Sequence, residues 1–127
     1  MTPQELQERT LVFSLRAYRF IKPLLSSAET RHIALQLLRS ATSVAANYRA
    51  ACLARSSKEW LAKLGVVREE ADESVLWLVF IQRAGMSNAA ANELDDLLGE
   101  ARELTRIFVA SYRTRQENRR RGSALEP

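Results

Sequence analysis

The sequence predicts an all-α fold, an antiparallel up-down-up-down four-helix bundle, and three observations support that prediction. Ala, Leu, Glu and Arg dominate the 127 residues, and only three prolines and four glycines occur. Apolar residues recur at helical spacing in four stretches, and the alternation typical of strands is missing. The connections between these stretches are short, which favours antiparallel neighbours in a single domain.

The first helix is expected over residues 3–22. Thr2 and Glu5 match a capping box, with Pro3 at the first helical position. The apolar residues that follow at helical spacing are Leu6, Phe13, Ala17, Phe20 and Leu24. Pro23 is expected to end or kink this helix, because proline lacks the amide hydrogen that a helix interior needs.

The second helix is expected over residues 27–54. Ser26 and Glu29 match a second capping box. The stripe that this helix should bury consists of Leu37, Leu38, Ala41, Val44, Ala45, Tyr48, Ala51 and Cys52. Because many of these positions are alanine, another helix is expected to approach this one closely.

The third helix is expected over residues 57–84, with Ser56 and Glu59 as its capping box and Gly85 in the left-handed position after its end. One apolar stripe contains Trp60, Leu64, Val67, Ala71, Ser74, Val75, Leu78 and Ile81. A second stripe at a different angle contains Val66, Glu70, Glu73, Trp77 and Phe80. A small chain covers only one stripe by itself, so the second predicts a homo-oligomer with Tyr48, Val66, Trp77 and Phe80 at the subunit interface.

The fourth helix is expected over residues 88–116, capped by Ser87. Its apolar stripe consists of Leu94, Leu97, Leu98, Ala101, Leu104, Thr105, Phe108 and Tyr112. Periodicity is lost from Gln116 onward, so residues 1–118 are expected to form the bundle and residues 119–127 a basic, disordered tail.

The composition favours a bacterial-type cytoplasmic protein. Cys52 is the only cysteine, which excludes an internal disulfide and a cysteine-based zinc site within one chain. The first residues are polar, and no apolar run approaches the roughly 18 residues of a membrane-spanning helix. A net charge of +4 and a pI of about 9.7 permit an anionic partner.

Residues 36–78 carry a family resemblance. Their sequence, QLLRSATSVAANYRAACLARSSKEWLAKLGVVREEADESVLWL, resembles the four-helix intervening-sequence protein family, first noted as reading frames inside bacterial large-subunit rRNA genes. The family pattern reads QLLRSGTSVGANYREA, then a basic turn, an (F/W)-x-x-K-L helix and EEADES-x-x-WL. This chain departs from it at Ala41 and Ala45, where the pattern has glycine, and at Ala50, where it has glutamate.

The resemblance implies a small four-helix bundle that assembles as a homopentameric barrel. A similar protein is the accessory variability protein of diversity-generating retroelements, a basic pentamer that binds nucleic acid and a partner reverse transcriptase. For most members of the family the activity is undefined. A pentamer, a nucleic acid and a protein partner are therefore the associations that the resemblance implies for this chain.

Two groups of basic residues are candidates for binding nucleic acid. The first surrounds the turn between the second and third helices: Arg49, Arg55, Lys58 and Lys63. The second lies near the C-terminus: Arg113, Arg115, Arg119, Arg120 and Arg121. Phosphate binding requires that they face one way, and the alternatives are a solvated turn and a solubilising tail. No aromatic residue interleaves with them in sequence, so a base-stacking platform is not indicated.

The central helices also carry embedded polar residues, Arg39, Asn47, Arg49, Glu70 and Glu73. Two carboxylates three residues apart suit metal binding or acid/base chemistry. The favoured interpretation is structural, with Glu70 or Glu73 paired to Arg39 or Arg49 and fixing register. No Glu-x-x-His motif is present, so the ligands of a di-iron bundle are missing. We expect no catalytic residue, metal or cofactor.

The two remaining reactive residue types have plain interpretations. His32 is the only histidine and is expected at the surface or at the helix start. Cys52 lies on an apolar stripe with no histidine near it in sequence, so it is expected to be a buried small hydrophobe.

Three hypotheses of function follow from these patterns. The first is a non-enzymatic homo-oligomeric scaffold, a pentamer by resemblance, that binds RNA or DNA through basic surface and docks a protein partner. The second is a protein–protein assembly module without nucleic-acid binding, in which charge serves solubility. The third, and least favoured, is an enzyme that uses Glu70 and Glu73.

Overall fold

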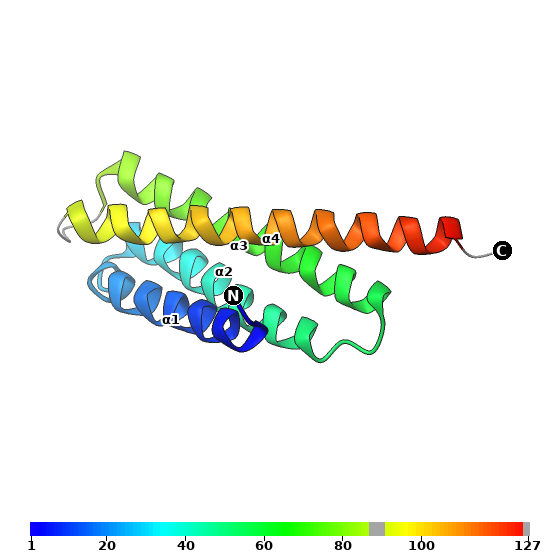
Figure 1. Cartoon of the computed structure of the whole chain (residues 1–127). Helices are drawn as coiled ribbons and strands as arrows, with labels where there is room; N and C mark the ends of the chain where they lie inside the picture. The colour runs from blue at the N-terminus through cyan, green and yellow to red at the C-terminus, as the bar shows by residue number, and fades with distance from the viewer. Residues whose placement is uncertain (87–90, 126–127) are drawn as a thin grey trace.

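The computed structural model describes residues 1–86 and 91–125, and within these all regular secondary structure is helical and no strand occurs, which confirms the predicted fold class. The helices are α1 (Pro3–Ile21), the short 3-10 helix η1 (Lys22–Leu25), α2 (Ala28–Cys52), α3 (Ser57–Ala84) and α4 (Ala91–Leu125). Each long helix runs antiparallel to the next (Figure 1). α1 and α3 each pack against both α2 and α4. None of the described helices is long and apolar enough to cross a membrane.

Local sequence signals explain most of the helix ends. The Thr2 hydroxyl accepts the amide hydrogen of Glu5 at 3.1 Å, and the Glu5 carboxylate accepts the amide hydrogen of Thr2 at 3.0 Å, which completes the capping box of α1. The Ser56 hydroxyl caps α3 by accepting the amide hydrogen of Glu59 at 3.1 Å. Gly85 ends α3 with a φ of 63°, a left-handed conformation that glycine adopts without strain.

The start of α2 differs from its expected capping box. Ser27, not Ser26, is at the N-cap, and no side chain caps the helix. The Ser26 hydroxyl instead donates a hydrogen bond to the Pro23 carbonyl at 3.3 Å. Pro23 lies in the first turn of η1, and the chain that follows η1 places Ser26 one residue before the N-cap of α2. The Arg31 guanidinium ties this turn to α2 by donating to the Leu25 carbonyl at 2.7 Å.

The predicted apolar stripes meet in one core. Phe13, Val44, Leu64 and Phe108, one from each long helix, are among the side chains that are almost completely buried. A domain of this length buries about two-thirds of its unfolded surface, and burial on that scale is the main source of stability for the bundle.

The expected close packing of α2 occurs on both of its sides. The Ser14 hydroxyl donates across to the Ala41 carbonyl at 2.9 Å, so α1 approaches the α2 backbone directly. On the other side, the hydroxyls of Ser40 and Ser74 lie 2.9 Å apart and link α2 to α3. Ala41 is fully buried, so the methyl group that it adds relative to glycine is accommodated.

The fourth helix is longer than expected. Its predicted start at residue 88 and the Ser87 cap lie outside the described residues. The disordered tail was expected over residues 119–127. This expectation is corrected for residues 119–125, because they continue α4 to Leu125. Arginine is a good helix former, and Glu117 lies four residues from both Arg113 and Arg121, a spacing that supports helix. The C-terminal end of α4 therefore extends beyond the other helices (Figure 1).

Candidate nucleic-acid interface

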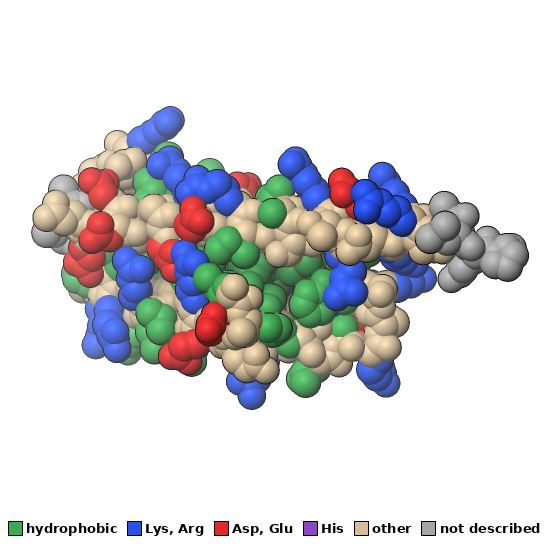
Figure 2. All heavy atoms as spheres, viewed as in Figure 1, with side chains coloured by type: hydrophobic (Ala, Val, Ile, Leu, Met, Phe, Trp, Pro, Cys, Tyr) green, Lys and Arg blue, Asp and Glu red, His purple; other side chains and the backbone are tan. Residues whose placement is uncertain are grey.

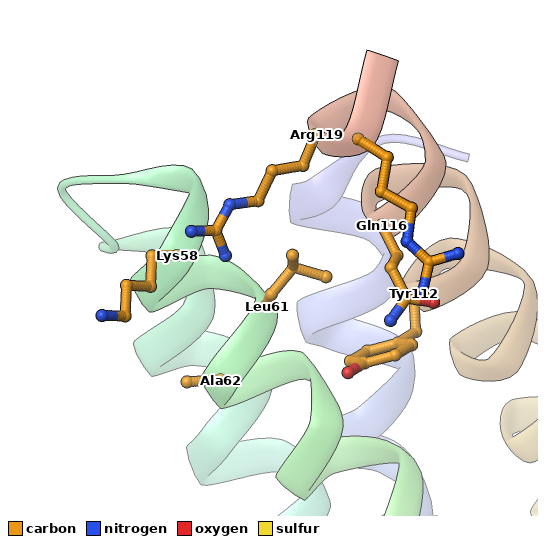
Figure 3. Close-up of a pocket in the computed structure, with 7 residues that line it drawn as sticks. Lys58, Leu61, Ala62, Tyr112, Gln116 and Arg119 are labelled. Carbon is orange, nitrogen blue, oxygen red and sulfur yellow. The ribbon is translucent and has the colours of Figure 1, made fainter. Parts of the chain in front are cut away.

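A cleft lies where the first two turns of α3 face the C-terminal end of α4 (Figure 3). Its volume is about 550 Å³. It is lined from α3 by Lys58, Leu61 and Ala62 and from α4 by Tyr112, Gln116, Arg119 and Arg120. The side chain of Arg119 extends from α4 toward α3. We call this site the α3/α4 cleft.

The charge of the α3/α4 cleft is positive. Lys58 lies on its α3 side, and Arg119 and Arg120 lie on its α4 side. Within residues 1–86 and 91–125, none of these cations forms an ion pair. Since a concave surface with charges of one sign concentrates the field, the cleft attracts anions more strongly than the same charges on a flat surface would.

Two cation–π contacts hold the end of α4 against α3. The guanidinium carbon of Arg68 lies 4.4 Å from the centre of the Tyr112 ring, and that of Arg115 lies 5.2 Å from the centre of the Trp60 ring. Tyr112 also rests on Gly65, where a Cβ atom would be 3.4 Å from Cε2 of the ring. Of the predicted basic residues, Arg115 thus lies over an aromatic ring, a contact that the sequence did not indicate.

The other predicted basic residues are dispersed. Arg55 lies 3.8 Å from the carboxylate of Glu59, and Arg49 lines a separate groove between α1 and α2. Lys63 is half-buried on α3. Arg113 and Arg121 are exposed on α4 but do not line the cleft. Of the nine predicted residues, the structure thus brings together Lys58, Arg119 and Arg120 in one cleft, whereas Arg115 contacts the Trp60 ring.

Three of the polar residues of the central helices, Arg39, Glu70 and Glu73, form an ion-paired cluster, as the structural interpretation expects. Arg39 Nη1 lies 3.1 Å from a Glu70 oxygen, and Nη2 donates to Glu73. The indole nitrogen of Trp77 also donates to Glu73, at 3.2 Å. The hydrogen bond from Arg39 lowers the pKa of Glu73, and the same bond raises the pKa of Arg39. Both carboxylates are therefore held by one guanidinium.

Asn47 and Arg49 stand apart from this cluster. The Asn47 amide donates to the carbonyl and the hydroxyl of Ser43, both at 2.9 Å. Arg49 makes no ion pair within the described part of the chain. Of the polar residues expected in this network, Arg39 is therefore the one that pairs with the carboxylates of α3 in the described part of the chain.

The four residues predicted at a subunit interface separate into two groups. Tyr48 is buried inside its own chain, with its ring centre 6.4 Å from that of Trp60 and 5.4 Å from that of Phe108. Burial raises the pKa of Tyr48. Val66 and Phe80 are exposed and Trp77 is half-buried, so these three remain on the surface of α3.

Sequence reasoning missed a second apolar surface, on α1. Leu11, Leu15 and Tyr18 are all more than 40% exposed and follow one another at i, i+4 and i+7. The same 3.6-residue periodicity that identified two stripes on the third helix would have identified this one. It borders the groove of about 420 Å³ between α1 and α2.

An ion pair between the first and last helices was also missed. Arg9 binds Glu100 through two hydrogen bonds, Nε to Oε2 at 2.9 Å and Nη2 to Oε1 at 2.7 Å. The hydrogen bond to Glu100 raises the pKa of Arg9. The pair links α1 to α4, the first and last helices of the bundle. Nothing in the local sequence identifies two residues so far apart as partners.

Reactive side chains in the described ranges do not gather into a metal site. No group of three or more His, Cys, Asp or Glu residues suited to a metal ion occurs there. His32 is exposed, as its interpretation requires. Cys52 is half-buried rather than buried and packs at the edge of the core near Tyr48.

Comparisons with known proteins agree with this architecture. A family model described as 23S rRNA-intervening sequence protein matches residues 4–110. The chain is also similar to a protein of unknown function from the S23 ribosomal protein family of Bacteroides thetaiotaomicron VPI-5482, whose crystal structure was determined at 1.70 Å resolution. The TM-score is 0.78 at 24% identity, over 89% of this chain and 99% of that chain, a likeness of fold. No curated protein matches the sequence.

Proposed function

This chain belongs to the 23S rRNA-intervening sequence protein family, and we propose that it is a non-enzymatic homo-oligomeric scaffold that binds nucleic acid through the α3/α4 cleft. The observation that carries the proposal is the arrangement of Lys58, Arg119 and Arg120 around one cleft without an ion pair among the described residues. Cations that are not neutralised by carboxylates are available to phosphates, and each phosphate contact adds affinity by releasing a counterion.

The C-terminal end of α4 strengthens this proposal. It carries five arginines against one glutamate between residues 113 and 121, and all of these residues except the half-buried Gln116 are exposed. Figure 2 shows Lys and Arg side chains gathered along this part of α4. The arginines lie beyond residue 110, where the family match ends.

Exposed apolar side chains on two different helices support the oligomeric part of the proposal. Leu11, Leu15 and Tyr18 lie on α1, and Leu76 and Phe80 lie on α3. Hydrophobic side chains are also visible between α4 and α1 on the face drawn in Figure 2. Two separate apolar surfaces on one subunit suit a head-to-tail contact, and a head-to-tail contact closes into a ring when the rotation allows. The number five is taken from the resemblance of residues 36–78.

The same apolar surfaces favour a second candidate, an assembly module that acts only through protein contacts. In that case a pull-down from lysate would recover one protein, and nuclease treatment would leave the recovery unchanged. Under the first proposal, nuclease treatment releases the associated material together with any partner that is held through nucleic acid.

A charge-neutralisation experiment tests the proposed function. The cleft variant replaces three cations by glutamine: Lys58→Gln, Arg119→Gln and Arg120→Gln. The control variant removes the same charge at the opposite end of the bundle: Arg16→Gln, Arg19→Gln and Arg83→Gln. Binding of a fluorescent oligonucleotide is followed by anisotropy as salt is raised from about 50 to about 200 mM.

We expect the wild-type protein and the control variant to bind with a similar dependence on salt. Since each single-stranded phosphate contact contributes about 0.7 to the slope of log K against log salt, the cleft variant should lose about two from that slope and bind more weakly. Equal losses in the two variants would show that only net charge matters. No binding by the wild-type protein at low salt would end the nucleic-acid proposal.

A further inference from the structure

We infer that the α3/α4 cleft selects unpaired nucleotides over duplex, so that its substrate class is single-stranded nucleic acid. This inference rests on the proposed function and concerns the same site. It follows from the combination of a cationic rim with an apolar floor. A surface that recognised phosphates alone would need only the rim.

The floor is the apolar part of the cleft lining, which consists of Leu61, Ala62 and the ring of Tyr112. Leu61 belongs to the buried part of α3, whereas Ala62 is exposed at the opening. A flat, partly apolar group such as a nucleobase covers such a floor, whereas a phosphate leaves it open to water. The volume of about 550 Å³ lies within the range of small-ligand sites.

Polar groups beside the floor are available to the edges of a base. Within the described residues, neither the Tyr112 hydroxyl nor the Gln116 amide makes a hydrogen bond. The guanidinium planes of Arg119 and Arg120 also offer stacking surfaces for an unstacked base. The floor thus suits the face of a base, the polar groups suit its edges, and the cationic rim suits the phosphate.

A duplex does not satisfy this site. Its bases are stacked inside the helix, and its outer surface presents phosphates on a convex cylinder. A duplex lying across the opening would contact Lys58 and the two arginines while the floor stayed uncovered. An unpaired strand can turn a base inward and keep its phosphates on the rim, as single-strand binding proteins do with aromatic and basic side chains.

The side chain of Tyr112 is held in place before any ligand arrives. Arg68 covers its ring at 4.4 Å, and Gly65 leaves room for the ring against α3. A group that is already ordered loses little conformational entropy on binding, which favours affinity. This arrangement also explains why the end of α4 stays close to α3.

The test compares one RNA of about 12 nucleotides, a length suited to single-strand sites, with the same RNA annealed to its complement. Anisotropy titrations at equal low salt should give roughly tenfold tighter binding of the single strand, the effect of about one well-covered base. Inorganic phosphate and a nucleoside monophosphate serve as competitors. The monophosphate should displace the strand at lower concentration than phosphate does, because it also covers the floor.

The variant that isolates the floor is Ala62→Phe, which fills the cleft without changing charge. It should abolish most of the preference for the single strand, about fivefold or more, because it weakens single-strand binding more than duplex binding. Ala110→Phe is the matched control, because Ala110 is exposed on α4 and lies outside the cleft.

The outcomes separate the inference from the proposed function. Equal binding of single strand and duplex, or equal competition by phosphate and the monophosphate, overturns the inference. If the glutamine variant of the cleft still weakens binding in that case, the proposed function survives. A loss in Ala110→Phe equal to that in Ala62→Phe also overturns the inference, because the effect would not come from the cleft floor.

Discussion

Replacing Gly99 by alanine tests whether the middle of α4 faces solvent, as it does in the isolated subunit. Gly99 lies in the interior of α4, and a Cβ atom built on it meets no atom within 4 Å. Glycine in a helix interior costs about 1 kcal/mol relative to alanine, because it loses more backbone entropy on folding. With no steric cost to offset this gain, Gly99→Ala should stabilise the protein by about 1 kcal/mol.

Gly65→Ala is the comparison for this prediction. There the new Cβ would lie 3.4 Å from Cε2 of Tyr112, at the edge of an ordinary contact. The same gain in helix propensity is therefore partly offset by a shift of the ring, and the stabilisation should be smaller than at Gly99. Because Tyr112 lines the α3/α4 cleft, this variant should also weaken nucleic-acid binding, which Gly99→Ala should not do.

The assay is thermal unfolding followed by circular dichroism at one fixed protein concentration, since oligomer stability depends on concentration. For a domain of this size, about 1 kcal/mol corresponds to a rise in Tm of roughly 3–5 °C. An unchanged or lowered Tm for Gly99→Ala would refute the reasoning. It would mean that the new methyl group meets other atoms, as it would if another subunit packed against α4 at this residue.

Three further predictions concern the core, the ion-paired cluster and the apolar surface of α3. Phe108→Ala should lower the free energy of unfolding in urea by about 3–5 kcal/mol, because Phe108 is completely buried; a loss below about 1 kcal/mol would contradict the assigned core. Arg39→Ala should cost about 1 kcal/mol or less near neutral pH, because Arg39 is half-exposed. Arg39 lowers the pKa of Glu73, so its contribution is present above the ordinary glutamate pKa of about 4.3 and disappears as pH falls through the lower folded pKa; a wild-type-to-variant difference that grew on acidification would contradict this assignment. Leu76→Asp combined with Phe80→Asp should reduce the solution mass without loss of helical circular dichroism, and an unchanged mass would exclude this surface from the subunit interface.

The helices and the core could be predicted because both are local properties of the chain. Caps such as Thr2 with Glu5, the glycine at position 85 and the 3.6-residue stripes are set within one or two turns. The predicted cap of α2, Ser26 with Glu29, was wrong because Pro23 determines the preceding turn, and the geometry of that turn overrides the match to a capping box. The predicted length of α4 was wrong because the loss of an apolar stripe marks only the end of burial, and a helix can continue beyond its buried part.

The α3/α4 cleft could be predicted only in part. The basic residues were identifiable by type, but which of them share a cleft depends on where α4 continues past the α2–α3 connection. Arg49 was expected with Lys58, yet it lies on α2 beside α1. Tyr112 and Trp60 were assigned to packing, and their contacts with Arg68 and Arg115 arise from the pairing of α3 with α4. Such pairings are properties of the tertiary fold.

The division of the predicted interface residues between core and surface could also be predicted only in part. Phe80 and Val66 lie on the second stripe of α3 and are exposed, whereas Tyr48 was assigned to the same interface and is buried between Trp60 and Phe108. Tyr48 lies on the buried stripe of its own helix, and that local signal was the more reliable guide.

The measurement that tests the central claim most directly is the solution mass by light scattering, with and without a mixed RNA and DNA pool, at low and high salt. We expect a stable multimer near five subunits whose mass increases with nucleic acid only at low salt, and no such increase for the variant with Lys58, Arg119 and Arg120 replaced by glutamine. A monomer whose mass is unaffected by nucleic acid at either salt concentration would contradict both the scaffold and its cleft.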